Sequence, residues 1–427
     1  MNIRIYNARI LTMEENIPIF EGELHIKENR ISYVGPSLEK SDIVWDREID
    51  ADKNVIMPGF KNAHTHSAMT FLRSYADDLP LQEWLHQQVF PNEAKLTADD
   101  ICQLSKLAIM EYLTSGITAN LDMYLNPDAI AKASEECGYR TTICSGFNDF
   151  TNSIEELEYW YQKYHNPNGL VNFRLGFHAE YTTSKEKLDK LAELVHKFKA
   201  SVDMHSSESK SEVEQCIERY GMTPTVLFEK LGLLEYGGTH FHCIHMTDED
   251  LDILKKRNIY VVTNPASNMK LASGIPRIKE MLERGIHVAI GTDGPASNNC
   301  LDMFREMFLV TGLAKIRECD AAAVDANEVL RMATVEGAHA MGLSQADVLA
   351  EGKFADLIMI DLHQPNMQPL NNITKNIVYS GNKQNVKMTM VNGKILYEDG
   401  KFDIGIPPEE VYAKANEIVA RIQALKT

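Results

Sequence analysis

Two histidines separated by one residue, His64 and His66, follow an apolar stretch that begins at Val55. The stretch predicts a buried β-strand, and side chains along a strand alternate between its two faces. The two imidazoles should therefore point to the same side at the end of the strand. Two such histidines can form half of a metal site, so the other half should lie elsewhere in the chain.

Four later strand-like runs also end in a residue type that binds metals, namely His178, His205, His245 and Asp293. A lone histidine is usually a core or surface residue, but packing does not explain this many at matching strand ends. Imidazole nitrogens and a carboxylate suit zinc, with iron as the next candidate. Three histidines and one aspartate would leave room for water, whose pKa a metal lowers toward neutrality.

Two carboxylates near these strand ends could move protons. Asp293 fits the part of a metal ligand that also acts as a base. Glu208 lies three residues beyond His205 and could carry a proton to a substrate nitrogen, although a solvent-facing glutamate at a helix start would look the same. The neighbouring pair His240 and His242 is expected inside its strand, before the strand end, and therefore either in the core or behind the metal ligands.

The middle of the chain alternates between strand-like and helical patterns. A capping-box start at Thr97 precedes apolar residues at helical spacing, and Gly116 ends that pattern. Eight strand-like runs separated by helices predict an α/β fold, a (β/α)₈ TIM barrel over residues 58–348, with its chemistry at the carboxyl ends of the strands. The runs are the segment entering His64 and residues 117–123, 140–145, 173–178, 201–205, 240–245, 259–264 and 287–293.

Both chain ends have a different texture. Residues 1–57 are rich in β-branched side chains, and residues 354–361 form a further strand-like run. A hairpin with an Asn392-Gly393 turn follows, and an amphipathic helix ends the chain after Pro408. We expect residues 1–57 and 349–427 to form one small β-sandwich domain with a C-terminal helix.

Composition narrows the class of protein. The 427 residues include 43 Lys and Arg against 61 Asp and Glu, a net charge of −18 that disfavours nucleic acid as a partner. The seven cysteines have no disulfide-framework or zinc-knuckle spacing. No apolar run approaches the ~18 residues that span a bilayer, and no signal peptide begins the chain. We expect a cytoplasmic protein that acts on a small molecule.

Taken in order, these motifs resemble the amidohydrolase superfamily, and within it the 5-methylthioadenosine/S-adenosylhomocysteine deaminases and their chlorohydrolase relatives. The resemblance covers nearly the whole chain. It rests on Pro58-Gly59-Phe60 before His64-Thr65-His66, His205 with Glu208, His242-Cys243-Ile244-His245, Asn264-Pro265-Ala266-Ser267-Asn268, Gly291-Thr292-Asp293-Gly294 and Gly352-Lys353-Phe354-Ala355-Asp356-Leu357.

The resemblance implies a role for each site residue. One metal ion would be held by His64, His66, His205 and Asp293, since the lysine that binuclear members place at the end of strand four is absent between Phe173 and Tyr181. His245 would orient a hydroxide, and Glu208 would shuttle a proton to the ring nitrogen beside the amine-bearing carbon. Subunits of the family associate, so a homo-oligomer is also expected.

Two matches concern the substrate. Glu93 matches the family glutamate that holds ribose hydroxyls, and His178 the histidine that contacts the purine. The arginines that bind the homocysteine carboxylate should fall near Glu135 and Ser145, but neither position is arginine. A carboxylate is usually met by an arginine fork. Adenosine, 5′-methylthioadenosine and 5′-deoxyadenosine are therefore favoured over S-adenosylhomocysteine.

The leading hypothesis is a metal-dependent aminohydrolase that converts a 6-aminopurine nucleoside to its 6-oxo form and ammonia. An alternative keeps the site but acts on a free base, a pterin or a triazine. A more remote alternative is a non-catalytic assembly protein that retains the barrel. Such proteins usually lose metal ligands, whereas this chain keeps each one that the pattern places.

Overall fold

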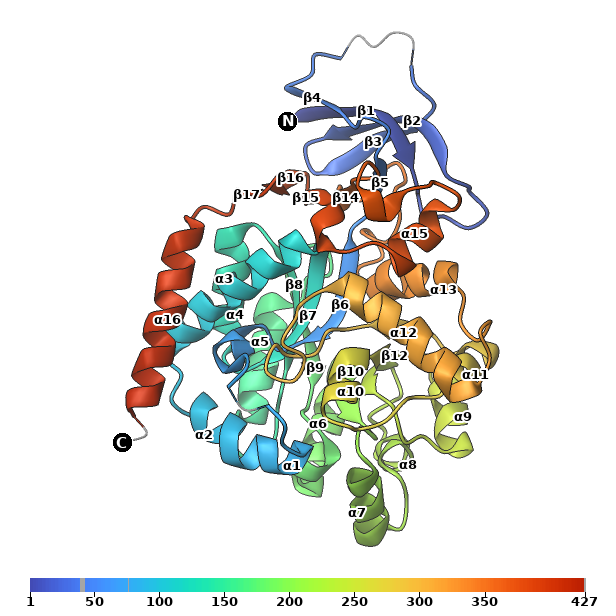
Figure 1. Cartoon of the computed structure of the whole chain (residues 1–427). Helices are drawn as coiled ribbons and strands as arrows, with labels where there is room; N and C mark the ends of the chain where they lie inside the picture. Colours follow the sequence, from blue (N-terminus) through green and yellow to red (C-terminus); the bar gives the residue numbers. More distant parts are fainter. Residues whose placement is uncertain (39–42, 76, 426–427) are drawn as a thin grey trace.

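A computed structural model describes residues 1–38, 43–75 and 77–425. Residues 39–42 and 426–427, which belong to the predicted terminal domain, lie outside the described residues. Two sheets organise the described chain, one of eight strands and one of nine. In Figure 1 the smaller part, a sheet with strands from both ends of the chain, lies at the top, and the larger part with its surrounding helices lies below it.

The eight-stranded sheet is a nearly closed parallel barrel, as predicted. Its ends are joined where the Asp293 backbone N–H donates to the His64 carbonyl at 3.0 Å. The side chain of Asn62 adds a bond, accepting from the Thr292 N–H at 2.8 Å. The strands, in barrel order, are β6 (Phe60–Thr65), β7 (Ile117–Tyr124), β8 (Arg140–Ser145), β9 (Val171–Gly176), β10 (Val202–Ser206), β11 (Gly238–His242), β12 (Ile259–Thr263) and β13 (Val288–Ile290).

Helices connect successive barrel strands. The predicted capping box at Thr97 is confirmed, because its side chain accepts from the Asp100 N–H while the Asp100 carboxylate accepts from the Thr97 N–H. The principal helices are α3 (Ala98–Thr114), α4 (Pro127–Cys137), α5 (Ile154–Tyr164), α6 (Lys185–Phe198), α7 (Lys210–Tyr220), α8 (Pro224–Lys230), α9 (Asp248–Lys256), α10 (Pro265–Lys270), α11 (Ile278–Glu283), α12 (Met303–Glu318), α13 (Ala326–Arg331) and α14 (Gly337–Ala340).

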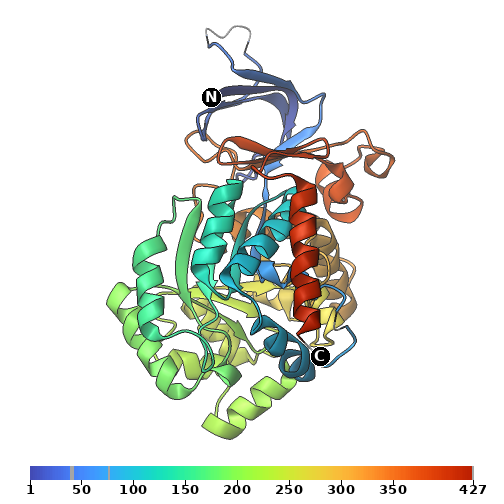
Figure 2. The same cartoon turned by 90° about the vertical axis from the view of Figure 1, so that its left-hand side faces the viewer.

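The second sheet is built from both chain ends, as predicted, and its strands follow one hydrogen-bonded path except for β4, which pairs with β1. The helix α15 (Ile373–Tyr379) lies between two of its strands in the chain, and α16 (Pro408–Ala424) follows the last strand and runs along the barrel beside α3 (Figure 2). The strands are β1 (Asn2–Ile10), β2 (Phe20–Lys27), β3 (Arg30–Gly35), β4 (Arg47–Asp50), β5 (Val55–Pro58), β14 (Leu357–Ile360), β15 (Val386–Val391), β16 (Lys394–Glu398) and β17 (Lys401–Phe402).

The stretch before His64 is two strands rather than the single strand expected. It divides at Gly59, so that β5 pairs with β1 and β14 in the second sheet, whereas β6 opens the barrel. A Cβ at Gly59 would lie only 2.1 Å from Thr118 Cγ2, so the close approach of β7 requires glycine here. The first barrel strand is thus directly continuous with the second sheet.

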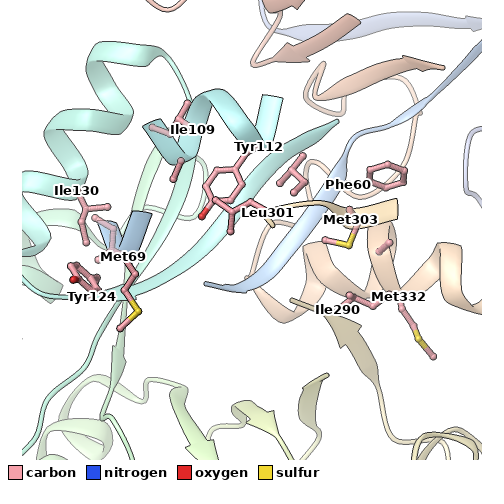
Figure 3. Packing of buried hydrophobic residues seen from close by; sticks show 14 of the residues in the cluster. Phe60, Met69, Ile109, Tyr112, Tyr124, Ile130, Ile290, Leu301, Met303 and Met332 are labelled. Carbon is pink, nitrogen blue, oxygen red and sulfur yellow. The ribbon is translucent and has the colours of Figure 1, made fainter. Parts of the chain in front are cut away.

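A large apolar cluster fills the space between barrel and helices. Figure 3 shows part of it, with Phe60, Tyr112, Ile130, Ile290 and Met332 among its buried members. None of the described helices has the length and apolar character that crossing a bilayer would require. Apolar packing therefore accounts for the contact between barrel and helices. It does not account for the polar side chains at the ends of the barrel strands.

Candidate active site

The four side chains predicted as metal ligands lie together at the carboxyl ends of the barrel strands. One nitrogen or oxygen from each of His64, His66, His205 and Asp293 lies within 4.8 Å of the others. Asp293 Oδ1 is 3.1 Å from His66 Nε2 and 3.4 Å from His64 Nε2. The histidines come from β6, the residue after it, and β10, while Asp293 follows β13 by three residues instead of ending it.

Backbone contacts orient two of these imidazoles. The Nδ1–H of His205 donates to the His178 carbonyl at 2.7 Å, and that of His66 donates to the Met123 carbonyl. Each ring therefore presents Nε2 to its neighbours, the second-sphere arrangement typical of histidine ligands. Among the described residues neither ring nitrogen of His64 has a hydrogen-bond partner, although the ring is fully buried. A buried imidazole in this state fits a metal ligand.

The Asp293 carboxylate is held by two hydroxyls. Ser267 and Ser297 donate to its Oδ2 at 2.6 and 2.8 Å, which leaves Oδ1 facing the histidines. Burial by itself would raise the pKa of Asp293, but the His64 and His66 rings lower that pKa well below its ordinary value. The carboxylate is thus kept ionised and aimed at the cluster, as a cation-binding group should be.

A cavity of about 510 Å³ opens beside the cluster. Its size suits a small-molecule ligand. Of the residues predicted to act on substrate, Glu93, His178, Glu208 and Asp293 all line it, as do His66 and His205. Two predicted residues do not line it, namely the metal ligand His64 and the predicted catalytic residue His245.

Glu208 is a buried cavity residue rather than a solvent-facing helix start, with an exposed fraction of 5%. Its backbone N–H donates to Glu212 Oε2 at 2.8 Å, and the neighbouring Ser207 N–H donates to Glu212 Oε1 at 3.0 Å. Burial raises the pKa of Glu208, so its protonated form is favoured more than in water. That property suits a group that must donate a proton near neutral pH.

His242, not His245, ends the sixth barrel strand, so the expected place of His242 before the strand end was wrong, whereas His240 lies in the core as expected. His242 and Cys243 both adopt left-handed backbone, with φ of 71° and 48°, and this breaks the alternation that would have kept His242 on the same face as the core residue His240. His242 lines the cavity with Nε2 3.9 Å from Glu208 Oε2. Its Nδ1–H donates to Asn268 Oδ1 at 2.7 Å.

His245 instead lies three residues beyond the strand. Its Nε2–H donates to the Ser273 carbonyl at 2.8 Å, and the Ser273 hydroxyl lies 3.5 Å from Glu208 Oε1. His245 therefore contacts the segment that supports Glu208, and reaches the cavity only through it.

The other two predicted substrate contacts, Glu93 and His178, are polar residues that line the cavity. Burial raises the pKa of Glu93 to about 7, and its Oε1 has no hydrogen-bond partner among the described residues. Burial lowers the pKa of His178 to about 3, so the ring is neutral, and its Nδ1 is hydrogen-bonded to Thr182 Oγ1 at 2.9 Å. Both can bind uncharged polar groups of a ligand.

Much of the remaining wall was not predicted. It comes from one helical segment made of α1 (Leu81–Trp84), a π-helical turn (Leu85–Val89) and α2 (Phe90–Glu93). The sequence did offer a signal, because Leu81, Trp84, Leu85 and Val89 recur at helical spacing between polar residues. A π-helical turn commonly marks a functional site because it inserts one extra residue into a helix face.

A parallel (β/α)₈ barrel with three histidines and an aspartate at its strand ends defines a metal-dependent hydrolase. Residues 55–396 match the sequence model of the Amidohydrolase family, and the chain belongs to that family.

Curated relatives extend this likeness over nearly the whole chain. A "5-methylthioadenosine/S-adenosylhomocysteine deaminase" of Moorella thermoacetica is 41% identical over 410 residues, which is 93% of this chain and 95% of the relative. A "5′-deoxyadenosine deaminase" of Methanosarcina mazei is 37% identical and covers 99% of this chain and 100% of the relative. A crystal structure of an adenosine deaminase from Xanthomonas campestris with bound zinc superposes with a TM-score of 0.93 at 29% identity, covering 99% and 98% of the two chains.

Proposed function

We propose that this protein is a hydrolytic deaminase that converts the 6-amino group of a purine nucleoside to a 6-oxo group and releases ammonia. The observation that carries the proposal is the meeting, in one cavity, of the His64, His66, His205 and Asp293 cluster with the buried acid Glu208. The names of the similar proteins support a nucleoside as substrate. Family membership supports hydrolysis of a carbon–nitrogen bond.

The donor set fits one divalent ion, and we propose zinc, with iron as the alternative. Three imidazole nitrogens and one carboxylate oxygen are a common catalytic set for zinc and leave a position open for water. An ion held there would lower the pKa of that water, so that hydroxide becomes available near neutral pH. The zinc bound in the Xanthomonas campestris structure supports this choice of metal.

The chain's own residues would then handle the protons. Asp293 accepts the proton that the attacking water loses, and Glu208 donates its proton to the ring nitrogen beside the amine-bearing carbon. Oxygen adds to that carbon, Asp293 passes its proton to the amine, and the carbon–nitrogen bond breaks to release ammonia. The hydroxyl on that carbon gives its remaining proton to the Glu208 carboxylate as the 6-oxo group forms, which restores the Glu208 acid. The proton that Glu208 had placed on the ring stays in the product, so water and nucleoside account for all atoms.

We assign the role of orienting the attacking oxygen to His242 rather than to His245. The hydrogen bond to Asn268 fixes the proton on His242 Nδ1, so its Nε2 faces the cavity beside Glu208. For substrate binding we propose Glu93 as the acceptor for sugar hydroxyls and His178 as a contact of the purine. Both line the same cavity as the cluster.

Three further expectations from the sequence stay proposals. These are a cytoplasmic location, association of identical subunits, and domain limits at residues 57/58 and 348/349. The first limit falls one residue before the end of β5 at Pro58.

The proposed function is tested by a screen for ammonia release. Protein loaded with zinc is incubated with adenosine, 5′-methylthioadenosine and 5′-deoxyadenosine, and in parallel with guanine, cytosine, pterins and triazines. We expect the native protein to release ammonia from the nucleosides. The Glu208→Gln variant should retain zinc but lose turnover by ~10²-fold or more. Turnover of free bases, pterins or triazines without any activity on nucleosides would refute the proposal.

A further inference from the structure

The polar lining of the cavity suits neutral ligand groups better than anionic ones. Glu93, Glu208 and Asp293 contribute three carboxyl groups to its lining. Among the described residues that line it there is no lysine or arginine. An anionic group of a ligand would therefore lose its hydration without gaining a counter-charge, which is unfavourable in a buried site.

The two positions at which the family resemblance led us to look for arginine do not change this. Ser145 ends β8 as a buried residue, and Glu135 is exposed on α4. Neither is part of the cavity lining. Lys187 contacts the loop after β8, where its Nζ donates to the Asn148 carbonyl at 2.6 Å and lies 4.8 Å from the Phe147 ring centroid. Its charge is therefore already engaged below that loop.

Away from the metal-ligand cluster, the cavity wall is largely apolar, with His86, Asn148 and Thr151 as polar members. Since the cluster and Glu208 take the amine-bearing end of the base, the remainder of a nucleoside must lie along this wall. The side chains that form it are Leu81, Trp84, Leu85, Val89, Phe90 and Phe150.

Phe150 differs from the rest of this wall because it is 80% exposed. The loop that carries it is nevertheless well fixed. Asn148 Oδ1 accepts from the Phe150 N–H at 2.8 Å and from the Thr151 N–H at 3.0 Å. The Asn148 carbonyl in turn accepts from Lys187 Nζ. An aromatic ring is thus presented at the cavity without an apolar cover of its own, and a ligand could supply that cover.

We propose that the cavity selects nucleosides whose 5′ substituent is uncharged and apolar, and that Phe150 is a specificity-determining residue for that substituent. This inference rests on the proposed function. 5′-Methylthio and 5′-deoxy groups would pack on the apolar wall and cover Phe150. An amino-acid or phosphate substituent would place a carboxylate or phosphate on the wall away from the metal-ligand cluster, where no described lining residue is a lysine or an arginine.

The test compares kcat/KM for four nucleosides on the zinc-loaded native protein. We expect 5′-methylthioadenosine and 5′-deoxyadenosine to exceed S-adenosylhomocysteine and 5′-AMP by roughly 100-fold or more, the scale of an unpaired buried charge. A value for S-adenosylhomocysteine within threefold of that for 5′-methylthioadenosine would overturn the inference while leaving the proposed function intact. Failure to deaminate any of the four, and adenosine as well, would refute the proposed function itself.

Variants at Phe150 separate its role from general packing. Phe150→Ala should lower kcat/KM for 5′-methylthioadenosine about tenfold, because apolar contacts in the pocket are lost. The decrease in kcat/KM for adenosine should be smaller. Phe150→Arg should raise the ratio of S-adenosylhomocysteine to 5′-methylthioadenosine by about tenfold or more, since it adds the missing cation. The control is Phe308→Ala, which removes a ring on α12 that is 52% exposed and does not line the cavity. An equal effect of Phe150→Ala on all substrates would overturn the assignment.

Discussion

At the scale of single residues, His242 shows how a side chain reaches the site through an unusual backbone. Left-handed φ angles at His242 and Cys243 cost free energy in residues other than glycine, of order 1 kcal/mol each. The strain turns the imidazole into the cavity, where Asn268 fixes its tautomer. Strain of this kind is typical of functional positions, which supports the role that we propose for His242.

This account predicts different outcomes for the two histidines of the His242-Cys243-Ile244-His245 motif. His242→Ala should lower kcat by roughly 10²-fold or more, the range for losing one preorganised group beside the reacting atoms. His245→Ala should cost less than about tenfold, since His245 acts through Ser273. Zinc content, measured in both variants, should stay near that of the native protein. The reverse order of the two effects would restore the role that the sequence suggested for His245.

The predictability of the site differed from residue to residue. His64, His66, His205 and Asp293 could be found because their types are rare at strand ends and their spacing follows the alternation of strands. The position of His242 was predicted wrongly because no sequence pattern indicates two residues with left-handed backbone at a strand end. Phe150 gave no signal either, since its position depends on hydrogen bonds of Asn148 within an irregular loop.

At the scale of elements, the start of α7 positions Glu208. The helix begins with a capping box in which Ser209 accepts from the Glu212 N–H while the Glu212 carboxylate accepts backbone N–H groups from residues 207–209. Glu212 is buried, so its carboxylate is fixed as well as hydrogen-bonded. The Glu212 side chain thus fixes the end of the loop after β10 and, with it, the position of the proposed proton donor Glu208.

Glu212→Ala should therefore act on catalysis as well as on stability. Loss of the cap should cost about 1 kcal/mol of unfolding free energy, and displacement of Glu208 should lower kcat by tenfold or more with zinc retained. The matched control is Glu214→Ala on the same helix, whose side chain is 63% exposed and pairs only with Lys210 at 3.5 Å. Similar kcat values for the two variants would show that the cap does not position Glu208.

The elements themselves could largely be predicted, because strand alternation, capping boxes and the Asn392-Gly393 turn are local signals. The division of the first barrel strand at Gly59 was missed, since both halves are apolar and buried and only tertiary pairing distinguishes them. The helical segment over residues 81–93 was missed although Leu81, Trp84, Leu85 and Val89 share one helix face. Local spacing cannot show that this apolar face lines a cavity.

At the scale of the whole molecule, a buried ion pair joins the barrel to the second sheet. Arg140, the first residue of β8, donates from Nε to Asp356 Oδ2 at 2.6 Å and from a second nitrogen to Oδ1 at 3.1 Å. The side chains are 1% and 0% exposed, and the guanidinium also lies 4.6 Å from the Phe354 ring centroid. This contact links residues 216 positions apart, which no local pattern could have predicted.

Removing one member of this pair should destabilise the protein strongly. Arg140→Met leaves a buried carboxylate without its partner and should lower the free energy of unfolding by ~3–5 kcal/mol, as measured by chemical denaturation. Arg47→Met is the control, because the Arg47–Glu398 pair also joins the two chain ends but is 42% and 33% exposed. That variant should cost no more than about 1 kcal/mol. Equal losses would mean that burial does not govern the strength of these contacts.

The central claim is that one metal ion held by the four-residue cluster makes this amidohydrolase a nucleoside deaminase. The most direct measurement adds zinc to metal-free protein and follows ammonia release from 5′-methylthioadenosine, with His64→Ala in parallel. Activity should rise from zero and saturate at one zinc per chain, and His64→Ala should neither bind zinc tightly nor turn over. Deamination without added metal, saturation at two ions per chain, or full activity of His64→Ala would contradict the account.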